Sequence, residues 1–303
     1  MSPAALSIRP ALLLAGAGFC LLAVGDAVVK TIAGAWPATA VAALRYAFGT
    51  IGLALIVWRL QGRAGFVMPL PWAQLGRGLA VATATVTFFA GVHLMPLADT
   101  TSIVFTSPMW TALISAVFLR ERIAGATWAA IALAFAGVLV VLRPNLANLG
   151  LAALLPLVAA LGMAVLMVLN RRVAGLAPVF TMQFLVAAIG TPFLIAAAVA
   201  ADRAGVPGYG VGWPDWTVVA RCLAVAFTAT AGHYCIFRAT ELASAARIAP
   251  MTYSQIVVAL GAGWLLFGDR PDLVALGGTA LIIAGGLVLW WNDRVRTVAR
   301  TPD

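Results

Sequence analysis

The fold is decided by residues 108–144, PMWTALISAVFLRERIAGATWAAIALAFAGVLVVLRP, and by their later counterpart, residues 249–289, APMTYSQIVVALGAGWLLFGDRPDLVALGGTALIIAGGLVL. Each stretch holds the end of one apolar run, a short charged segment and a second apolar run. A helix that spans a membrane needs about 20 mostly apolar residues. The same membrane-hairpin pattern is therefore predicted twice in one chain.

The composition of the whole chain agrees with a membrane protein. Hydrophobic residues make up 63% of the 303 residues, charged residues 10%, and the mean hydropathy is +1.03. A soluble domain carries about 25% charged residues, so this chain has too few charges to cover a water-facing exterior. The net charge of +9 does not indicate a nucleic-acid partner, because the basic residues form short clusters between apolar runs.

Ten apolar segments are long enough to cross a bilayer. They are residues 11–32, 38–58, 73–93, 98–119, 124–142, 150–170, 179–200, 216–237, 244–267 and 273–291. Turn-forming residues separate them, for example Arg143-Pro144-Asn145 and the Gly/Pro-rich residues 201–215. The first run is too long for the apolar part of a signal peptide, so we expect it to be a retained span.

The distribution of basic residues predicts the orientation. With a cytoplasmic N-terminus, the inner loops and tails hold twelve arginines, whereas the outer loops hold three, Arg143, Arg203 and Arg270. Cytoplasmic loops carry the excess of Lys and Arg in membrane proteins. We therefore expect a multi-pass protein of a bacterial-type inner membrane with both termini in the cytoplasm.

The chain also repeats itself. At an offset of 148 residues, Leu119–Arg122 falls on Phe267–Arg270, and Ala136–Val140 falls on Ala284–Val288; at an offset of 141, Lys30 falls on Arg171 and Pro37 on Pro178. The chain divides into residues 1–145 and 146–303, with five spans in each. Because five is odd, the second half is inverted. The fold class is thus an all-α membrane protein with ten transmembrane helices in two inverted five-helix repeats, an arrangement typical of secondary transporters.

The two quoted stretches resemble the repeat unit of the EamA-type drug/metabolite transporter superfamily. The shared features are a proline in the fourth helix, an acidic residue after a Leu/Phe-rich helix end and a glycine-containing fifth helix. Lys30, Pro37 and Arg45 also fit the first-half pattern of that family. Within span 1, Val24-Gly25-Asp26-Ala27 departs from the Trp/Asn-containing stretch that is common there.

The resemblance implies a ten-helix carrier with a central cavity that moves small metabolites by alternating access. Among its branches, the chain is most like the amino-acid exporters; other branches import metabolites such as riboflavin or S-adenosylmethionine. We expect export of amino acids and related small metabolites. The alternatives are import of a larger metabolite and, in a different class, a non-transporting membrane scaffold.

The sequence contains no motif that would indicate an enzyme. Paired catalytic carboxylates, a His/Cys/Asp metal cluster and a phosphate-cradling glycine loop are all missing from it. We therefore expect no cofactor, no metal and no ATP-driven step. The expected partners are a small-molecule substrate and membrane lipid, without nucleic acid, and the two fused halves can work as a monomer.

Three charges within the spans are the first candidates for the substrate site. Asp26 and Lys30 are four residues apart on one helix face, and Arg45 lies at a similar depth in the next span. A charge at the bilayer centre costs about 2.5–3.5 kcal/mol, so such residues face the bundle interior or water. We expect Asp26 to lie near Lys30 or Arg45, either as a fixed ion pair or as a substrate or proton site.

Further candidates are polar or aromatic residues at mid-depth, each of which could instead serve helix packing. They are Thr87, Phe88, Trp110, Met163, Tyr253 and Gln255. Two charged clusters at helix ends, Arg120-Glu121-Arg122 and its counterpart around Asp269, are expected to fix topology or to act as gates rather than to bind substrate.

Overall fold

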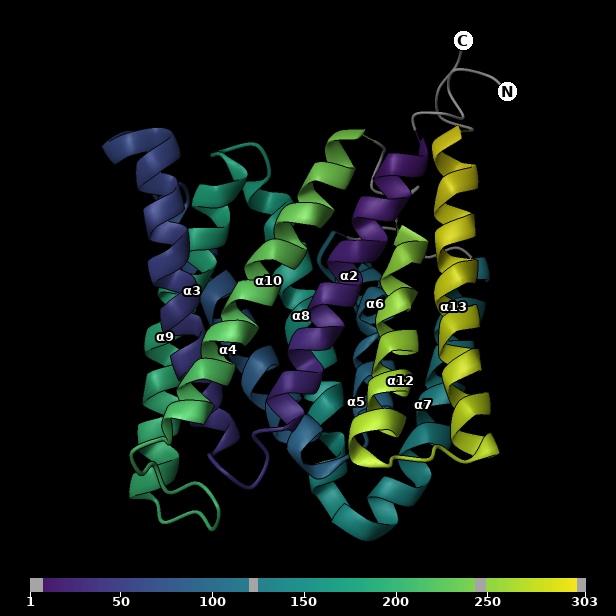
Figure 1. Cartoon of the computed structure of the whole chain (residues 1–303). Helices are drawn as coiled ribbons and strands as arrows, with labels where there is room; N and C mark the ends of the chain where they lie inside the picture. The colour runs from purple at the N-terminus through teal and green to yellow at the C-terminus, as the bar shows by residue number, and fades with distance from the viewer. Residues whose placement is uncertain (1–7, 120–124, 243–248, 299–303) are drawn as a thin grey trace.

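The computed structural model describes residues 8–119, 125–242 and 249–298, and within them it consists of helices joined by loops (Figure 1). The expected cluster Arg120-Glu121-Arg122 lies outside the described residues. The helices are α2 (Ile8–Lys30), α3 (Ala38–Gln61), α4 (Pro71–Leu94), α5 (Leu97–Val104), α6 (Ser107–Leu119), α7 (Gly125–Leu149), α8 (Leu155–Val173), α9 (Val179–Arg203), α10 (Trp216–Leu242), α12 (Ser254–Phe267) and α13 (Leu273–Val298), with short 3-10 turns η1 (Gly62–Gly65), η2 (Gly150–Leu154) and η3 (Ala249–Tyr253).

The helices match the ten predicted crossings. Within the described residues, six helices are long and apolar enough to cross a membrane, and three shorter apolar helices cover residues 127–143, 251–267 and 273–288. The remaining crossing is the broken segment formed by α5 and α6. Large apolar side chains such as Leu13, Leu55 and Leu265 are more than half exposed, as expected where helices face lipid.

The fourth span differs from the single helix expected over residues 98–119. It breaks at Phe105 and Thr106, two residues before Pro108. Proline has no N–H to donate, and it disfavours helical geometry in the residue before it, so the helix is interrupted here. The ninth span is also discontinuous, because η3 precedes α12; residues 243–248 of that expected span lie outside the described part.

The predicted break at Arg143-Pro144-Asn145 is wrong, because α7 continues to Leu149. The Asn145 side-chain amide donates to the Val141 carbonyl, one turn earlier in this helix, at 3.3 Å. The turn comes at Gly150, whose φ of 57° lies in the left-handed region that favours glycine. The expected boundary between the two repeats, after residue 145, therefore falls in the last turns of α7. The division of the chain into residues 1–145 and 146–303 stays a prediction.

The main helix contacts run between the halves rather than within them. In the first half, α2 packs most extensively on α10, and in the mirrored pairing α8 of the second half packs on α4. The counterparts α3 and α9 pack on each other, as do α7 and α13. The beginning of α2 and the end of α13 lie at the same end of the bundle (Figure 1), which is the arrangement that an even number of crossings requires.

Pairs of equivalent residues touch where the two halves meet. The hydroxyls of Thr50 and Thr191, which are 141 residues apart, are hydrogen-bonded at 3.0 Å. Between α7 and α13, Gly137 faces Ile282, while Gly285 faces Ala134 in the mirrored contact. A residue can touch its own counterpart only at a pseudo-two-fold axis. The inverted repeat of the sequence is therefore also a repeat of contacts.

A pH prediction arises where α10 begins. The exposed Asp215 carboxylate accepts a hydrogen bond from the Thr217 N–H at 2.8 Å, and this contact lowers the pKa of Asp215 below its ordinary value. A carboxyl group with a lowered pKa in the folded state stabilises the protein above its unfolded pKa of about 3.9, and this contribution is lost as the pH falls below that value. We expect the melting temperature of Asp215→Ala to lie slightly below that of the wild type at pH 6, and the difference to shrink as the pH falls below about 4 and through the lowered folded-state pKa of Asp215.

Candidate functional site

Two residues of opposite charge lie within electrostatic range of each other inside the bundle. Asp26 lies on α2 and Arg45 on α3, and both side chains are partly buried. They are close enough to interact electrostatically, but within the described residues Asp26 has neither a hydrogen bond nor an ion pair. The Arg45 guanidinium lies over the rings of Tyr46, at 4.8 Å, and Phe89, at 5.6 Å.

The position of these charges follows from the ends of their helices. At a rise of about 1.5 Å per residue, Asp26 lies about 6 Å below the end of α2, and Arg45 lies about 10 Å from the start of α3. Next to Asp26, Gly25 allows α2 to approach α10 closely, because a Cβ at Gly25 would lie 2.6 Å from the Thr228 hydroxyl. A charge that faces lipid is costly, so the accessible surface of both side chains must face a polar space between helices.

Lys30, the third expected charge, has a different partner. Its ammonium forms an ion pair with Asp269 at 2.5 Å, donates to the Met95 carbonyl at 3.2 Å and lies 4.9 Å from the centre of the Phe267 ring. Of the two neighbours predicted for Asp26, the structure thus places Arg45 beside it. Lys30 instead joins α2 to the end of α12.

The sequence reasoning missed Asp99 and Asn145. Asp99, on α5, is 5% exposed and accepts a hydrogen bond from the Asn145 amide of α7 at 2.9 Å. It also interacts electrostatically with Lys30, Asp269 and Asp272. A carboxylate in the apolar segment after Pro96 was the signal that could have revealed it.

A second group of candidates gathers at the break between α5 and α6. The ring of Tyr253 packs edge-on against Phe105 at 6.1 Å, and its hydroxyl occupies the space where Gly286 has no side chain. Trp110 packs edge-on against Phe135 at 4.8 Å, and its buried indole N–H has no hydrogen-bond partner among the described residues. Both aromatic residues therefore join the broken helices to α7 and α13.

The remaining candidates are spread over three helices. The Thr87 hydroxyl donates to the Thr83 carbonyl of its own helix at 2.8 Å, and Phe88 packs against the largest apolar core. Met163, like Tyr46, packs against a small core of α4, α8 and α9, and Gln255 is partly buried on α12. The structure brings together Asp26 and Arg45, and separately Trp110, Tyr253 and the α5–α6 break. The assignment of all nine residues to substrate binding stays a prediction.

Arginine side chains tie helices together near both ends of the bundle. At the end where the termini lie, Arg77 of α4 is 5% exposed, donates to Asn170 of α8 at 2.6 Å and also bonds Gln74. At the opposite end, Arg221 of α10 donates to the Thr31 carbonyl at 2.9 Å. Arg77 follows Trp72 by five residues, as Arg221 follows Trp216, so these links also mirror each other.

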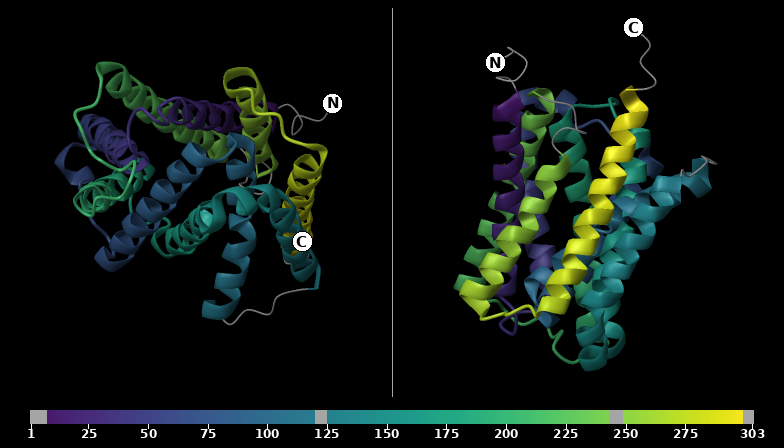
Figure 2. Two further views of the ribbon diagram at one scale, coloured as in Figure 1. Left: turned by 90° about the horizontal axis from the view of Figure 1, so that it is seen from below. Right: turned by 90° about the vertical axis from the view of Figure 1, so that its right-hand side faces the viewer.

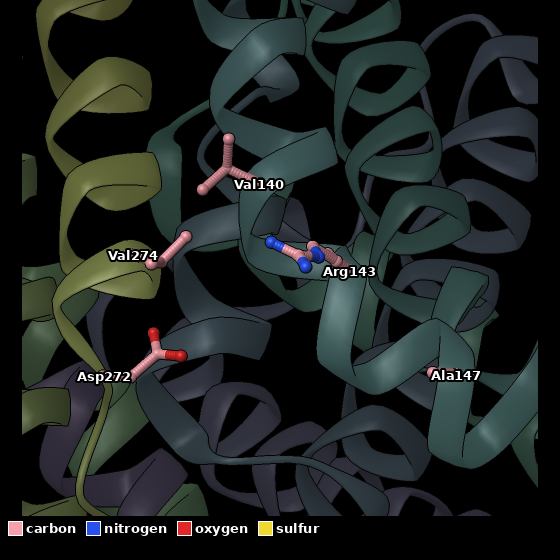
Figure 3. Close-up of a pocket in the computed structure, with 5 residues that line it drawn as sticks. All are labelled: Val140, Arg143, Ala147, Asp272 and Val274. Carbon is pink, nitrogen blue, oxygen red and sulfur yellow. The ribbon is translucent and has the colours of Figure 1, made fainter.

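A recess of about 390 Å³ lies between the last turns of α7 and the beginning of α13 (Figure 3). It is lined by Val140, Arg143, Ala147, Asp272 and Val274. Arg143 and Asp272 are exposed and form no ion pair with each other. Among the residues that the structure describes, no group of three or more His, Cys, Asp or Glu side chains could hold a metal ion.

The model of the EamA-like transporter family matches this chain twice, over residues 9–143 and 150–291. The chain belongs to the EamA-like transporter family. The two matches together cover most of the sequence, and each includes five of the ten crossings. The protein is therefore a multi-pass membrane transporter of this family.

Relatives within the family differ in what they carry. The chain is 29% identical to a riboflavin transporter of Rhizobium johnstonii over 94% of this chain and 91% of that protein. It is 26% identical to the pseudopaline exporter CntI of Pseudomonas aeruginosa, over 93% and 96% of the two chains. It is 22% identical to an S-adenosylmethionine uptake transporter of Rickettsia bellii, over 84% of each.

A solved crystal structure supports the fold alone. It covers 94% of this chain and 97% of its own with a TM-score of 0.61, at 19% sequence identity. The named relatives include both an exporter and uptake transporters. Membership of the EamA-like family therefore leaves the substrate and the direction of transport to be derived from the site.

Proposed function

We propose that this EamA-like protein is a secondary carrier that exports amino acids and related small zwitterions across a bacterial inner membrane. The observation that carries the proposal is the arrangement of Asp26 and Arg45. They have opposite charges, lie within electrostatic range of each other, remain partly accessible and form no direct ion pair. Both termini are expected in the cytoplasm.

A zwitterion fits this arrangement because it brings one charge for each side chain. The guanidinium of Arg45 offers paired N–H donors to a substrate carboxylate, while Asp26 can accept hydrogen bonds from an ammonium group. The partly buried aromatic rings of Tyr46 and Phe88 provide apolar surface for a side chain. Export is favoured by the similarity to the pseudopaline exporter, which extends over almost the full length of both proteins.

Counterflow in proteoliposomes tests this proposal. Vesicles that contain the purified protein are loaded with one unlabelled compound at a time. The entry of the same compound, labelled and added outside, is then followed. The panel contains amino acids, riboflavin and S-adenosylmethionine. We expect accelerated exchange of one or more amino acids.

Exchange of riboflavin or S-adenosylmethionine without exchange of any amino acid would show that the proposed substrate class is wrong. The conclusion that the protein is a carrier would stand. A protein that exchanges none of the compounds, although it is folded and oriented, would support the scaffold alternative. Vesicles without protein provide the background rate. The ratio of the substrate concentrations inside and outside the vesicles is then measured with and without a proton gradient. A higher ratio with the gradient identifies proton flow as the energy source.

A further inference from the structure

We propose that the ion pair between Lys30 and Asp269 is the outer gate of this carrier, and that Asp99 is the alternative partner of Lys30 when the gate opens. Lys30 ends α2, and Asp269 follows the end of α12. The contact joins a helix of the first half to a helix of the second half. This gate proposal rests on the proposed transport function, because a gate is needed only where a binding site opens alternately to the two sides of the membrane.

The location of the pair places it between the outer solution and the charged site. Lys30 and Asp26 lie on one face of α2, with Asp26 one helical turn deeper. The ends of α2 and α12 lie at the end of the bundle opposite the termini (Figure 1). The side chain of Lys30 is only 12% exposed, and that of Asp269 is 23% exposed. A substrate that reaches Asp26 from this side must therefore pass the pair.

The ammonium of Lys30 makes three contacts, from two parts of the fold. Phe267 and Asp269 approach it from the end of α12 and the residues just after it, while the Met95 carbonyl approaches from the junction of α4 and α5. All three contacts lie at the same end of the bundle, so breaking the ion pair would free the end of α12 from the first half. Movement of a broken helix such as η3–α12 is a means by which carriers expose a central site.

Asp99 gives Lys30 a second carboxylate within electrostatic range. Asp99 is on α5, and its Oδ2 atom is oriented by Asn145 of α7. Lys30, Asp99 and Asn145 all belong to the first half, whereas Asp269 belongs to the second. If Lys30 transfers from Asp269 to Asp99, the link between the halves is lost without leaving a buried ammonium unpaired, which would be costly.

The opposite end of the bundle has a different shape. In the inverted repeat, α6 is the counterpart of α12, and the end of α6 with the beginning of α7 stands away from the other helices (Figure 2, right). The end of α12, by contrast, is fixed to α2 by the ion pair. The structure is therefore closed on the side of Lys30, as a carrier with a closed outer gate should be.

Cysteine labelling tests the gate without knowledge of the substrate. Cys222 of α10 is fully buried and close enough to Arg45 to interact with it electrostatically. Cys20 and Cys235 are replaced by serine, and a membrane-impermeant thiol reagent is added to vesicles from the side opposite the termini. We expect Asp269→Asn to increase the labelling rate of Cys222 about tenfold, which corresponds to a tenfold shift toward the open state.

Three further variants make the test specific. Asp272→Asn removes an exposed carboxylate three residues away, and it should label like the parent. The exchange of both charges, Lys30→Asp with Asp269→Lys, should restore slow labelling. Asp99→Asn should slow both labelling and counterflow, because it removes the alternative partner of Lys30.

Equal labelling of Asp269→Asn and Asp272→Asn, with both proteins monodisperse in detergent, would overturn the gate. So would fast labelling of the exchanged pair or unchanged labelling of Asp99→Asn. None of these results depends on which compound is carried. A failed gate and a failed substrate proposal are therefore distinguishable.

Discussion

Arg45→Gln is expected to lower the rate of counterflow at low substrate concentration by about 100-fold. Loss of one partner from a desolvated charge contact costs about 2–5 kcal/mol, and each factor of ten in rate corresponds to about 1.4 kcal/mol. The glutamine keeps a polar side chain over Tyr46 and Phe89, so the protein should remain folded. Arg45→Lys should retain part of the activity, because an ammonium keeps the charge but not the paired donors of a guanidinium.

The matched control for this result is Arg59→Gln. Arg59 is on the same helix, is exposed and lies beside Leu55 and Leu60 at the protein surface. It should exchange substrate at the wild-type rate. If both arginine variants lose activity equally, or if Arg45→Gln transports normally, Arg45 does not hold the substrate.

Gly278→Leu is expected to cause a large loss of stability, and its neighbour Gly277→Leu a small one. A Cβ at Gly278 would lie 2.9 Å from the Gly137 carbonyl oxygen and 2.8 Å from Val141, whereas a Cβ at Gly277 would meet no atom within 4 Å. Overpacking costs about 1–3 kcal/mol. Because part of the obstacle is backbone, we expect about 3 kcal/mol for Gly278→Leu, which lowers the melting temperature by about 5 °C in a protein of this size.

Tryptophan fluorescence during heating, in one detergent at one protein concentration, measures this difference. The two substitutions add the same side chain to adjacent positions of α13, so helix propensity and hydrophobicity are matched. Gly137→Leu should resemble Gly278→Leu, because a Cβ at Gly137 would lie 2.5 Å from the Gly278 carbonyl oxygen. Equal melting temperatures for Gly277→Leu and Gly278→Leu would contradict the close packing of α7 on α13.

The ten-helix fold could be predicted because two signals in the sequence are long and regular. Apolar length identified the spans, and the offsets of 141 and 148 residues revealed the inverted repeat. The offset of 141 reappears in the contact between Thr50 and Thr191. The offset of 148 relates the contact of Gly137 with Ile282 to the mirrored contact of Gly285 with Ala134. Apolar length also explains the error at Pro144, because hydropathy records where a chain can lie in lipid but not whether a helix continues past it.

The site was less accessible to sequence reasoning. The nearness of Asp26 and Arg45 could be predicted from their depths in consecutive spans. The pairing of Lys30 with Asp269 could not, because it joins residues 239 positions apart and depends on how the halves pack. Asp99 escaped notice for a related reason: its importance comes from Lys30 and Asn145, which converge on it only in the folded protein.

The most direct test of the account is competition by three matched compounds against the counterflow of a carried amino acid. The first is the amino acid itself, the second is the amine that lacks its carboxylate, and the third is the carboxylic acid that lacks its ammonium group. If Arg45 binds the carboxylate and Asp26 the ammonium, only the zwitterion should compete well, and Asp26→Asn should selectively weaken its advantage over the carboxylic acid. Equal competition by all three compounds, or an unchanged preference in Asp26→Asn, would contradict the account.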